Sequence, residues 1–136
     1  MGRLARIAWA SPTSLLGLVL LPFFRNRWYT RGVILAEGAS WPRRLGWKYR
    51  AITFGHVVLA IEELDEKTMV HELEHVRQYE KVGPLYPILY LLASIRAMLR
   101  GGHYYRDNRF ELEARAAEDA WEAARASVGR SPSTTP

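Results

Sequence analysis

Apolar residues recur at intervals of three and four in the middle of the chain, with polar residues at most positions between them. This spacing is typical of an amphipathic helix. Its apolar members are Met69, Val70, Leu73 and Val76. Asp65 or Thr68 can cap the start, and Gly83, followed by Pro84, can end the helix. The pattern therefore predicts a helix over residues 66–82.

Two later segments also have helical patterns. Residues 85–100 are almost entirely apolar and contain Pro87 near their start, so we expect a helix interrupted there and buried on several sides or in contact with lipid. Residues 107–127 are rich in Ala and have one apolar side, which predicts a second amphipathic helix. That apolar side comprises Phe110, Leu112, Ala114, Ala117 and Trp121.

The strand candidates lie before the first of these helices. Residues 32–36 form a short apolar run, residues 38–42 have the composition of a turn, and residues 48–59 alternate and are rich in β-branched and aromatic residues. The last segment predicts one or two strands broken near Gly55. The free edge of the strand at residues 52–59 can bind an extended peptide. Helices and strands together predict an α+β protein.

A five-residue motif lies inside the predicted helix at 66–82. Residues 71–75 have the sequence His-Glu-Leu-Glu-His, the HExxH pattern. Residues four apart share one face of a helix, so His71 and His75 can bind one metal ion while Glu72 faces a water bound to it. The motif fixes three positions only and also occurs by chance on ordinary helices, but the helical context that it requires is present. The motif predicts a zinc-dependent hydrolase.

Two histidines do not complete a catalytic zinc site. Such sites normally have three protein ligands and a water, and a carboxylate is a common third ligand. The acidic residues that follow the motif helix are concentrated between 107 and 119. A ligand from this second helix would close the site.

The two helices together resemble the gluzincin zinc peptidases, and at this length their small single-domain members, the minigluzincins. The resemblance rests on HExxH at 71–75 and Glu-x-x-Ala at 111–114, and it spans about residues 33–120. Residues 51–59 resemble the strand before the motif helix, and residues 71–79 and 105–111 are similar to segments of uncharacterised small bacterial proteins. The resemblance implies a zincin-like metallopeptidase that acts on peptides or proteins, with Glu111 joining the two histidines as zinc ligand.

The resemblance also implies an architecture for residues 31–128: a short sheet, the active-site helix, an apolar backing helix and a C-terminal helix that carries the third ligand. One position departs from the family pattern. Gluzincins commonly have Asp after the Ala of the second motif, whereas this chain has Arg115. An Asp there would orient a ligand histidine. Glu118 and Asp119, about a turn further along, are expected to be solvated or to support the ligands.

Glu111 also fits a capping role. Asn108 is a good N-cap, and a Glu three residues later completes a capping box in which the carboxylate bonds the backbone N–H of the cap. Glu113 would then be the ligand. Both alternatives remain open from sequence alone.

The proposed chemistry places further residues near the motif. Glu72 is expected to act as general base on a water whose pKa zinc lowers toward ~7. His103, Tyr104 and Tyr105 lie between a Gly-Gly pair and the second ligand helix, and His103 and Tyr105 are the candidates for stabilising the oxyanion. The alternative for these three is a structural aromatic loop.

Composition agrees with a small enzyme. The chain has 136 residues, of which 49% are hydrophobic and 24% charged, enough for one domain with a core. It contains no Cys, which excludes disulfides, thiolate zinc sites and cysteine nucleophiles. A reducing compartment, and hence a cytoplasmic location, is expected.

Charge is distributed unevenly. Residues 1–50 contain nine Lys or Arg and one acid, whereas the rest contain ten and thirteen, so the two parts carry +8 and −3. The basic part also holds four of the five Trp residues and the apolar run 15–24. This combination favours residues 1–30 as a contact with an anionic membrane surface, peripheral at the inner membrane face. The run is too short to span a bilayer unaided.

The basic N-terminal region also fits different roles. It can be a hydrophobic flap packed on the core, or a signal peptide, although Arg25 and Arg27 follow the apolar run where small residues are expected. The pI of about 9.8 would also be compatible with nucleic-acid binding. No nucleic-acid-binding motif is present, however, and the protein is not expected to bind nucleic acid. The alternative to an enzyme is a catalytically silent zincin-fold protein that binds membranes or partners. Residues 129–136 are predicted to be a disordered tail.

Overall fold

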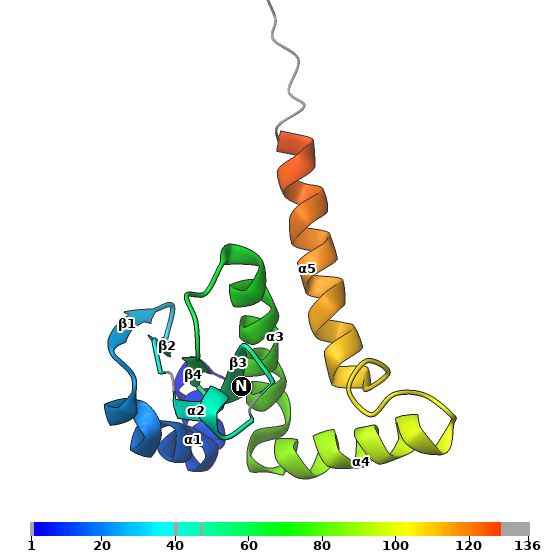
Figure 1. The fold of residues 1–136 in the computed structure, drawn as a ribbon, viewed down its shortest axis with the longest axis horizontal. Coiled ribbons are helices and arrows are strands. Elements are labelled where there is room, and N and C mark those ends of the chain that lie inside the picture. The colour runs from blue at the N-terminus through cyan, green and yellow to red at the C-terminus, as the bar shows by residue number, and fades with distance from the viewer. Residues whose placement is uncertain (1, 40, 47, 129–136) are drawn as a thin grey trace, which may run out of the picture.

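A small mixed sheet and a set of helices form an α+β protein in the computed structural model, which describes residues 2–39, 41–46 and 48–128 (Figure 1). The predicted tail at 129–136 lies outside the described residues. The helices are α1 (Arg3–Leu20), α2 (Trp41–Arg44), α3 (Glu66–Val82), α4 (Tyr86–Leu99) and α5 (Arg109–Val128), with 3-10 turns η1 (Leu21–Phe23) and η2 (Gly83–Leu85). The strands are β1 (Asn26–Thr30), β2 (Val33–Glu37), β3 (Ala51–Phe54) and β4 (Val57–Ala60).

The sheet has the strand order β1-β2-β4-β3, so β3 is an edge strand. Strands β2 and β4 are parallel, and the two outer pairs are antiparallel. The predicted break near Gly55 is confirmed as the β3–β4 turn. Strand β1 was not predicted. It joins β2 through Arg31 and Gly32, both with positive φ as a tight hairpin turn requires, so the expected boundary at residue 30 falls inside a hairpin.

Helices cover both faces of the sheet. One face packs on α3 because alternate strand residues point to it, and this cluster contains Val33, Leu35, Val58 and Val76. The other face packs on the end of α1 and on Phe24, and this cluster contains Ala36, Ala39, Val57 and Leu59. Strand β4 is buried at every position. The sheet therefore fixes α3, and with it the HExxH motif, from behind.

Helix α3 has the predicted bounds. Asp65 caps it by accepting the backbone N–H of Thr68 at 2.7 Å, and Gly83 ends it with a φ of 61°. The interruption expected at Pro87 is wrong. Pro87 lies in the first turn of α4, where a backbone N–H would have no partner within the helix, so the missing N–H costs no hydrogen bond. The turn predicted at 38–42 is wrong at its end, because Trp41 and Pro42 lie in the short helix α2.

Helix α5 lies beside α3 and runs antiparallel to it (Figure 1). Contacts between the two helices show the direction, since Lys67 pairs with Glu122, whereas Gln78 near the other end of α3 pairs with Glu113. Ala114 is fully buried. This small residue allows α5 to approach the motif helix closely.

Candidate metal centre

Two histidines one turn apart on α3 and a carboxylate from the first turn of α5 meet inside the protein. His71 Nε2 lies 3.1 Å from His75 Nε2 and 3.2 Å from Glu111 Oε2. His75 Nε2 lies 3.4 Å from Glu111 Oε1. All three residues are buried, and one nitrogen or oxygen atom from each lies within 4.8 Å of the others. This group could hold a metal ion.

Gln78 determines which nitrogen of His75 faces the cluster. Its Nε2 donates to the Phe110 carbonyl and to Glu113 Oε2, both at 3.0 Å, so its Oε1 must face His75 Nδ1 at 2.9 Å. The Tyr86 hydroxyl donates to the same Oε1 at 2.9 Å. The proton of His75 is therefore on Nδ1, and Nε2 presents a lone pair to the cluster.

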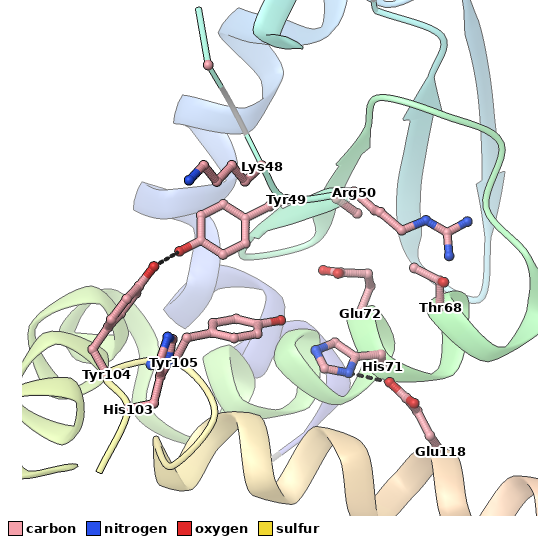
Figure 2. A pocket seen from close by; sticks show the side chains of 12 residues that line it. Lys48, Tyr49, Arg50, Thr68, His71, Glu72, His103, Tyr104, Tyr105 and Glu118 are labelled. Carbon is pink, nitrogen blue, oxygen red and sulfur yellow. Dashed lines mark hydrogen bonds and ion pairs between the residues drawn. The ribbon is translucent and has the colours of Figure 1, made fainter. Parts of the chain in front are cut away.

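Glu118 orients the other histidine. His71 Nδ1 lies 2.5 Å from Glu118 Oε1, a contact visible in Figure 2. A carboxylate in this position fixes the ring, keeps its proton on Nδ1 and raises the basicity of Nε2. Arg115, at the position where the sequence resemblance would expect Asp, instead donates to the Arg106 carbonyl. Glu118 lies about one turn beyond it on α5 and makes the contact with the histidine.

The cluster fits a bound cation. With both Nδ1 atoms protonated, two Nε2 lone pairs and a carboxylate face one another, and acceptors this close repel unless a positive charge lies between them. Ligand atoms at ~2.0–2.1 Å from a tetrahedral zinc are ~3.3 Å apart, and the distances here are 3.1–3.4 Å. Burial alone would raise the pKa of Glu111, but its proximity to His71 and His75 lowers it below the usual range, so the carboxylate is negatively charged.

Glu111 does not cap α5. Asn108 caps the helix with its own side chain, which accepts a backbone N–H at 3.0 Å, and its backbone N–H donates to the Tyr105 carbonyl at 3.2 Å. The Glu111 carboxylate instead accepts from the Tyr90 hydroxyl at 2.7 Å and faces the histidines. The capping-box alternative is therefore not realised, and Glu113 points to the Gln side chain described above.

Glu72 lies beside the cluster and is only 6% exposed. Its Oε2 accepts from the Thr53 hydroxyl of β3 at 2.7 Å, which orients the carboxylate. Burial raises the pKa of Glu72, and His75 and the Thr53 hydrogen bond reduce the rise. A carboxylate with a raised pKa is suited to accepting and returning a proton near neutral pH.

Two adjoining cavities form a cleft at the cluster. The first, about 630 Å³, has Lys48, Arg50 and Glu118 in its lining (Figure 2). The second, about 430 Å³, has mainly aromatic and aliphatic walls and reaches all three candidate ligands. Glu72 lines both cavities. The edge strand β3 borders the cleft, with Ala51 in both linings.

Tyr105 is the predicted oxyanion donor that lies nearest to Glu72. It lines both cavities, and its hydroxyl points toward the space between Glu72 and His71 (Figure 2). Burial and the negative charge of Glu111 raise the pKa of Tyr105, so the hydroxyl stays protonated and able to donate. The oxyanion role of Tyr105 stays a prediction.

His103 and Tyr104 lie at the outer side of the cleft. His103 Nδ1 accepts the backbone N–H groups of Tyr105 at 3.1 Å and Arg106 at 3.2 Å, so its ring holds the loop together. The hydroxyl of Tyr104 lies 3.2 Å from that of Tyr49 across the cleft. These contacts favour the structural-loop alternative for both residues.

Several supporting residues were not predicted. They are Thr53, Gln78, Tyr86 and Tyr90, and Glu118 was expected only as a solvated or supporting group. Spacing offers a signal for two of them, since Gln78 follows His75 by three residues and Glu118 follows Glu111 by seven, each on a shared helix face. The others come from separate elements, so no spacing relates them to the motif.

No family model, curated protein or solved structure matches this chain.

Glu118→Ala is expected to weaken metal binding ~10-fold to 100-fold, because His71 loses the carboxylate that orients it. Competition with a chromophoric chelator measures this. Glu122→Ala is the matched control, since Glu122 lies one turn further along α5 and pairs with Lys67 at 2.8 Å. An equal loss in both variants would mean that acidic charge near the site matters, rather than the orientation of His71.

Proposed function

We propose that the protein is a zinc-dependent metallopeptidase. The observation that carries the proposal is the convergence of His71, His75 and Glu111 on one point, with the buried carboxylate of Glu72 beside them on an open cleft. Two histidines and a glutamate are the ligands of catalytic zinc in metallopeptidases, and they leave a coordination position for water. Side chains of this type favour zinc over the hard cations, which prefer oxygen alone.

Each residue of the site has a chemical task in this proposal. Zinc, when bound, supplies a water of lowered pKa and polarises the peptide carbonyl. Glu72 accepts a proton as the water attacks and passes it to the leaving nitrogen. Thr53 holds the Glu72 carboxylate in place through its 2.7 Å hydrogen bond. Tyr105 donates a hydrogen bond to the oxygen that becomes negative.

The edge strand gives the substrate a direction. Strand β3 pairs with β4 on one side only, and its other side borders the cleft. An extended peptide can add to this edge through backbone hydrogen bonds, which places a scissile bond near Glu72. The arrangement of β3, α3 and the antiparallel α5 supports a zincin-like fold, and the buried Ala114 supports the Glu-x-x-Ala motif of gluzincins.

Zinc content and cleavage test the proposal together. The purified protein is expected to contain about one zinc per chain and to cleave unstructured protein or a peptide library. A chelator should stop cleavage, and added zinc should restore it. If zinc-loaded protein cleaves no peptide, the proposed peptidase activity is wrong and the protein only binds the metal.

A pair of variants tests the third ligand. Glu111→Ala is expected to weaken zinc binding by more than the ~10-fold to 100-fold typical of a supporting residue, because a direct ligand is lost. Glu113→Ala is the control, since Glu113 is half-exposed and contacts Gln78 and Arg109 rather than the histidines. Loss of zinc from Glu113→Ala but not from Glu111→Ala would move the ligand by two residues.

A further inference from the structure

Helix α1 packs on the protein with its small residues. Ala10 is fully buried, and Ser14 Oγ accepts the backbone N–H of His56 at 2.9 Å. A Cβ at Gly17 would lie 2.6 Å from the Cβ of Val57, so the close approach of α1 to the sheet requires glycine there. A helix of a globular protein normally buries its large apolar residues. The burial pattern of α1 is the reverse.

Most large apolar residues of α1 and η1 face outward, whereas Leu20 and Leu21 pack on the core. The exposed ones are Leu4, Trp9, Leu15, Leu16, Leu18, Val19 and Phe23. No charged residue occurs between Arg6 and Arg25. Pro12 cannot donate to the Ala8 carbonyl, but the Ser11 hydroxyl does so at 2.7 Å. This carbonyl therefore keeps a hydrogen-bond partner without water, as an apolar environment requires.

Helix α4 has a second exposed apolar stripe. Its members, with the preceding residue of η2, are Leu85, Ile88, Leu91, Leu92, Ile95, Met98 and Leu99. Their spacing of three and four places most of them on one face. Helix α1 contacts the turn η2 before α4, where the Trp9 indole covers Gly83 and leaves no room for a Cβ. In Figure 1, α1 and α4 lie along the lower border and α5 extends away from it.

The charged residues within the two segments that contain these helices have one sign, and a nearby acid, Glu80 of α3, pairs with Arg6 at 3.4 Å. Residues 1–36 contain five Arg, residues 81–106 contain four Lys or Arg, and neither segment contains an Asp or Glu, although the chain has 14. Arg25, Arg27, Arg96 and Arg100 are exposed. An apolar surface with basic residues and no acids is complementary to the acyl chains and anionic headgroups of a bilayer.

We infer that α1 and α4 together dock the protein on the surface of an anionic lipid bilayer. By length and composition, Leu4–Phe23 and Glu66–Leu99 are also weak candidates for membrane spans. The packing of Ala10 and Gly17 holds α1 on the sheet, and α3 within the second segment carries the buried His and Glu residues. Both helices therefore lie along the membrane surface rather than across the bilayer.

The apolar half of the cleft lies between the same two helices. The cavity of about 430 Å³ is lined by Thr13 and Leu16 of α1, by Pro87 and Tyr90 of α4, and by Glu72. Docking through α1 and α4 brings this opening to the lipid surface. This position of the cleft assigns the substrate class as peptide segments held at a membrane surface, an assignment that rests on the proposed function.

Sedimentation with vesicles tests the docking with the full chain. We expect the protein to bind phosphatidylcholine vesicles that contain phosphatidylglycerol and to bind vesicles of phosphatidylcholine alone weakly. Added salt should reduce the binding. Val19→Gln with Leu91→Gln should lower binding at least ~10-fold, and each single change should lower it in part. Both side chains are exposed, 68% and 60%, and neither lines the cleft, so the fold is retained.

The matched control is Leu45→Gln with Leu112→Gln, which removes two apolar side chains that are 77% and 51% exposed outside α1 and α4. Equal loss in this control, or unchanged binding of the Val19 and Leu91 variant, would overturn the docking surface. If the wild type is a dimer that does not bind vesicles, and the Val19 and Leu91 variant is a monomer, the apolar surface is a protein interface instead. If cell membranes retain the protein after washing with alkaline carbonate, the protein spans the bilayer rather than lying on its surface.

Vesicle binding distinguishes this inference from the peptidase proposal. Glu72→Gln is expected to bind vesicles like the wild type, so docking stands even if no cleavage is found. If the protein cleaves, a lipid-anchored peptide on vesicles should be cleaved ~10-fold faster than the same free peptide, through its raised local concentration. The Val19 and Leu91 variant should lose this advantage and cleave the free peptide normally. Equal rates for both peptides in the wild type would contradict the substrate class.

Discussion

Glu72→Gln is expected to lower the rate of peptide cleavage ~10²-fold to 10⁴-fold while the zinc content and the fold stay unchanged. An amide cannot accept the proton of the attacking water at neutral pH. Its oxygen can still accept from the Thr53 hydroxyl, which lies 2.7 Å from the carboxylate, so the buried site keeps its hydrogen bond. Steady-state kcat/KM and zinc per chain measure the two effects.

Glu74→Gln is the matched control for that experiment. Glu74 lies on the same helix, two residues away, and pairs with Arg77 at 3.2 Å instead of facing the cluster. The control should cleave at the wild-type rate. Equal rates for both variants would show that another group accepts the proton.

His71→Ala and His75→Ala are each expected to weaken zinc binding by at least ~100-fold, because two remaining ligands do not hold the ion tightly. The structure adds a second cost. Each change leaves a hydrogen-bond partner without its imidazole, the partly buried Glu118 in the first case and the buried Gln78 in the second. Metal analysis after dialysis against a weak chelator measures the loss.

His103→Ala is the control for this loss, because the ring of His103 accepts two loop N–H groups and lies outside the cluster. Its zinc content should equal that of the wild type. Full zinc occupancy in the His71 and His75 double variant would place the metal elsewhere or exclude it.

Local features of the chain were predicted well because their causes are local. The bounds of α3 follow from the Asp65 cap and from Gly83, and the break between β3 and β4 follows from Gly55. Strand β1 was missed because its pairing partner, β2, decides its conformation. Pro87 was expected to interrupt a helix because the sequence does not show that α4 begins at Tyr86, one residue before the proline.

The HExxH spacing was enough to predict that two imidazoles share one helix face with a glutamate between them, since residues four apart lie on the same side of a helix. Which α5 carboxylate faces them depends on how the two helices pack, and no local pattern reveals it. Glu111 and Glu113 are two residues apart, which on a helix is a rotation of ~200°, and the packing of α5 against α3 around Ala114 fixes that rotation. Likewise, the sequence shows that residues 1–30 are apolar and basic, but the close fit of Gly17 on Val57 decides that most large side chains of α1 face outward.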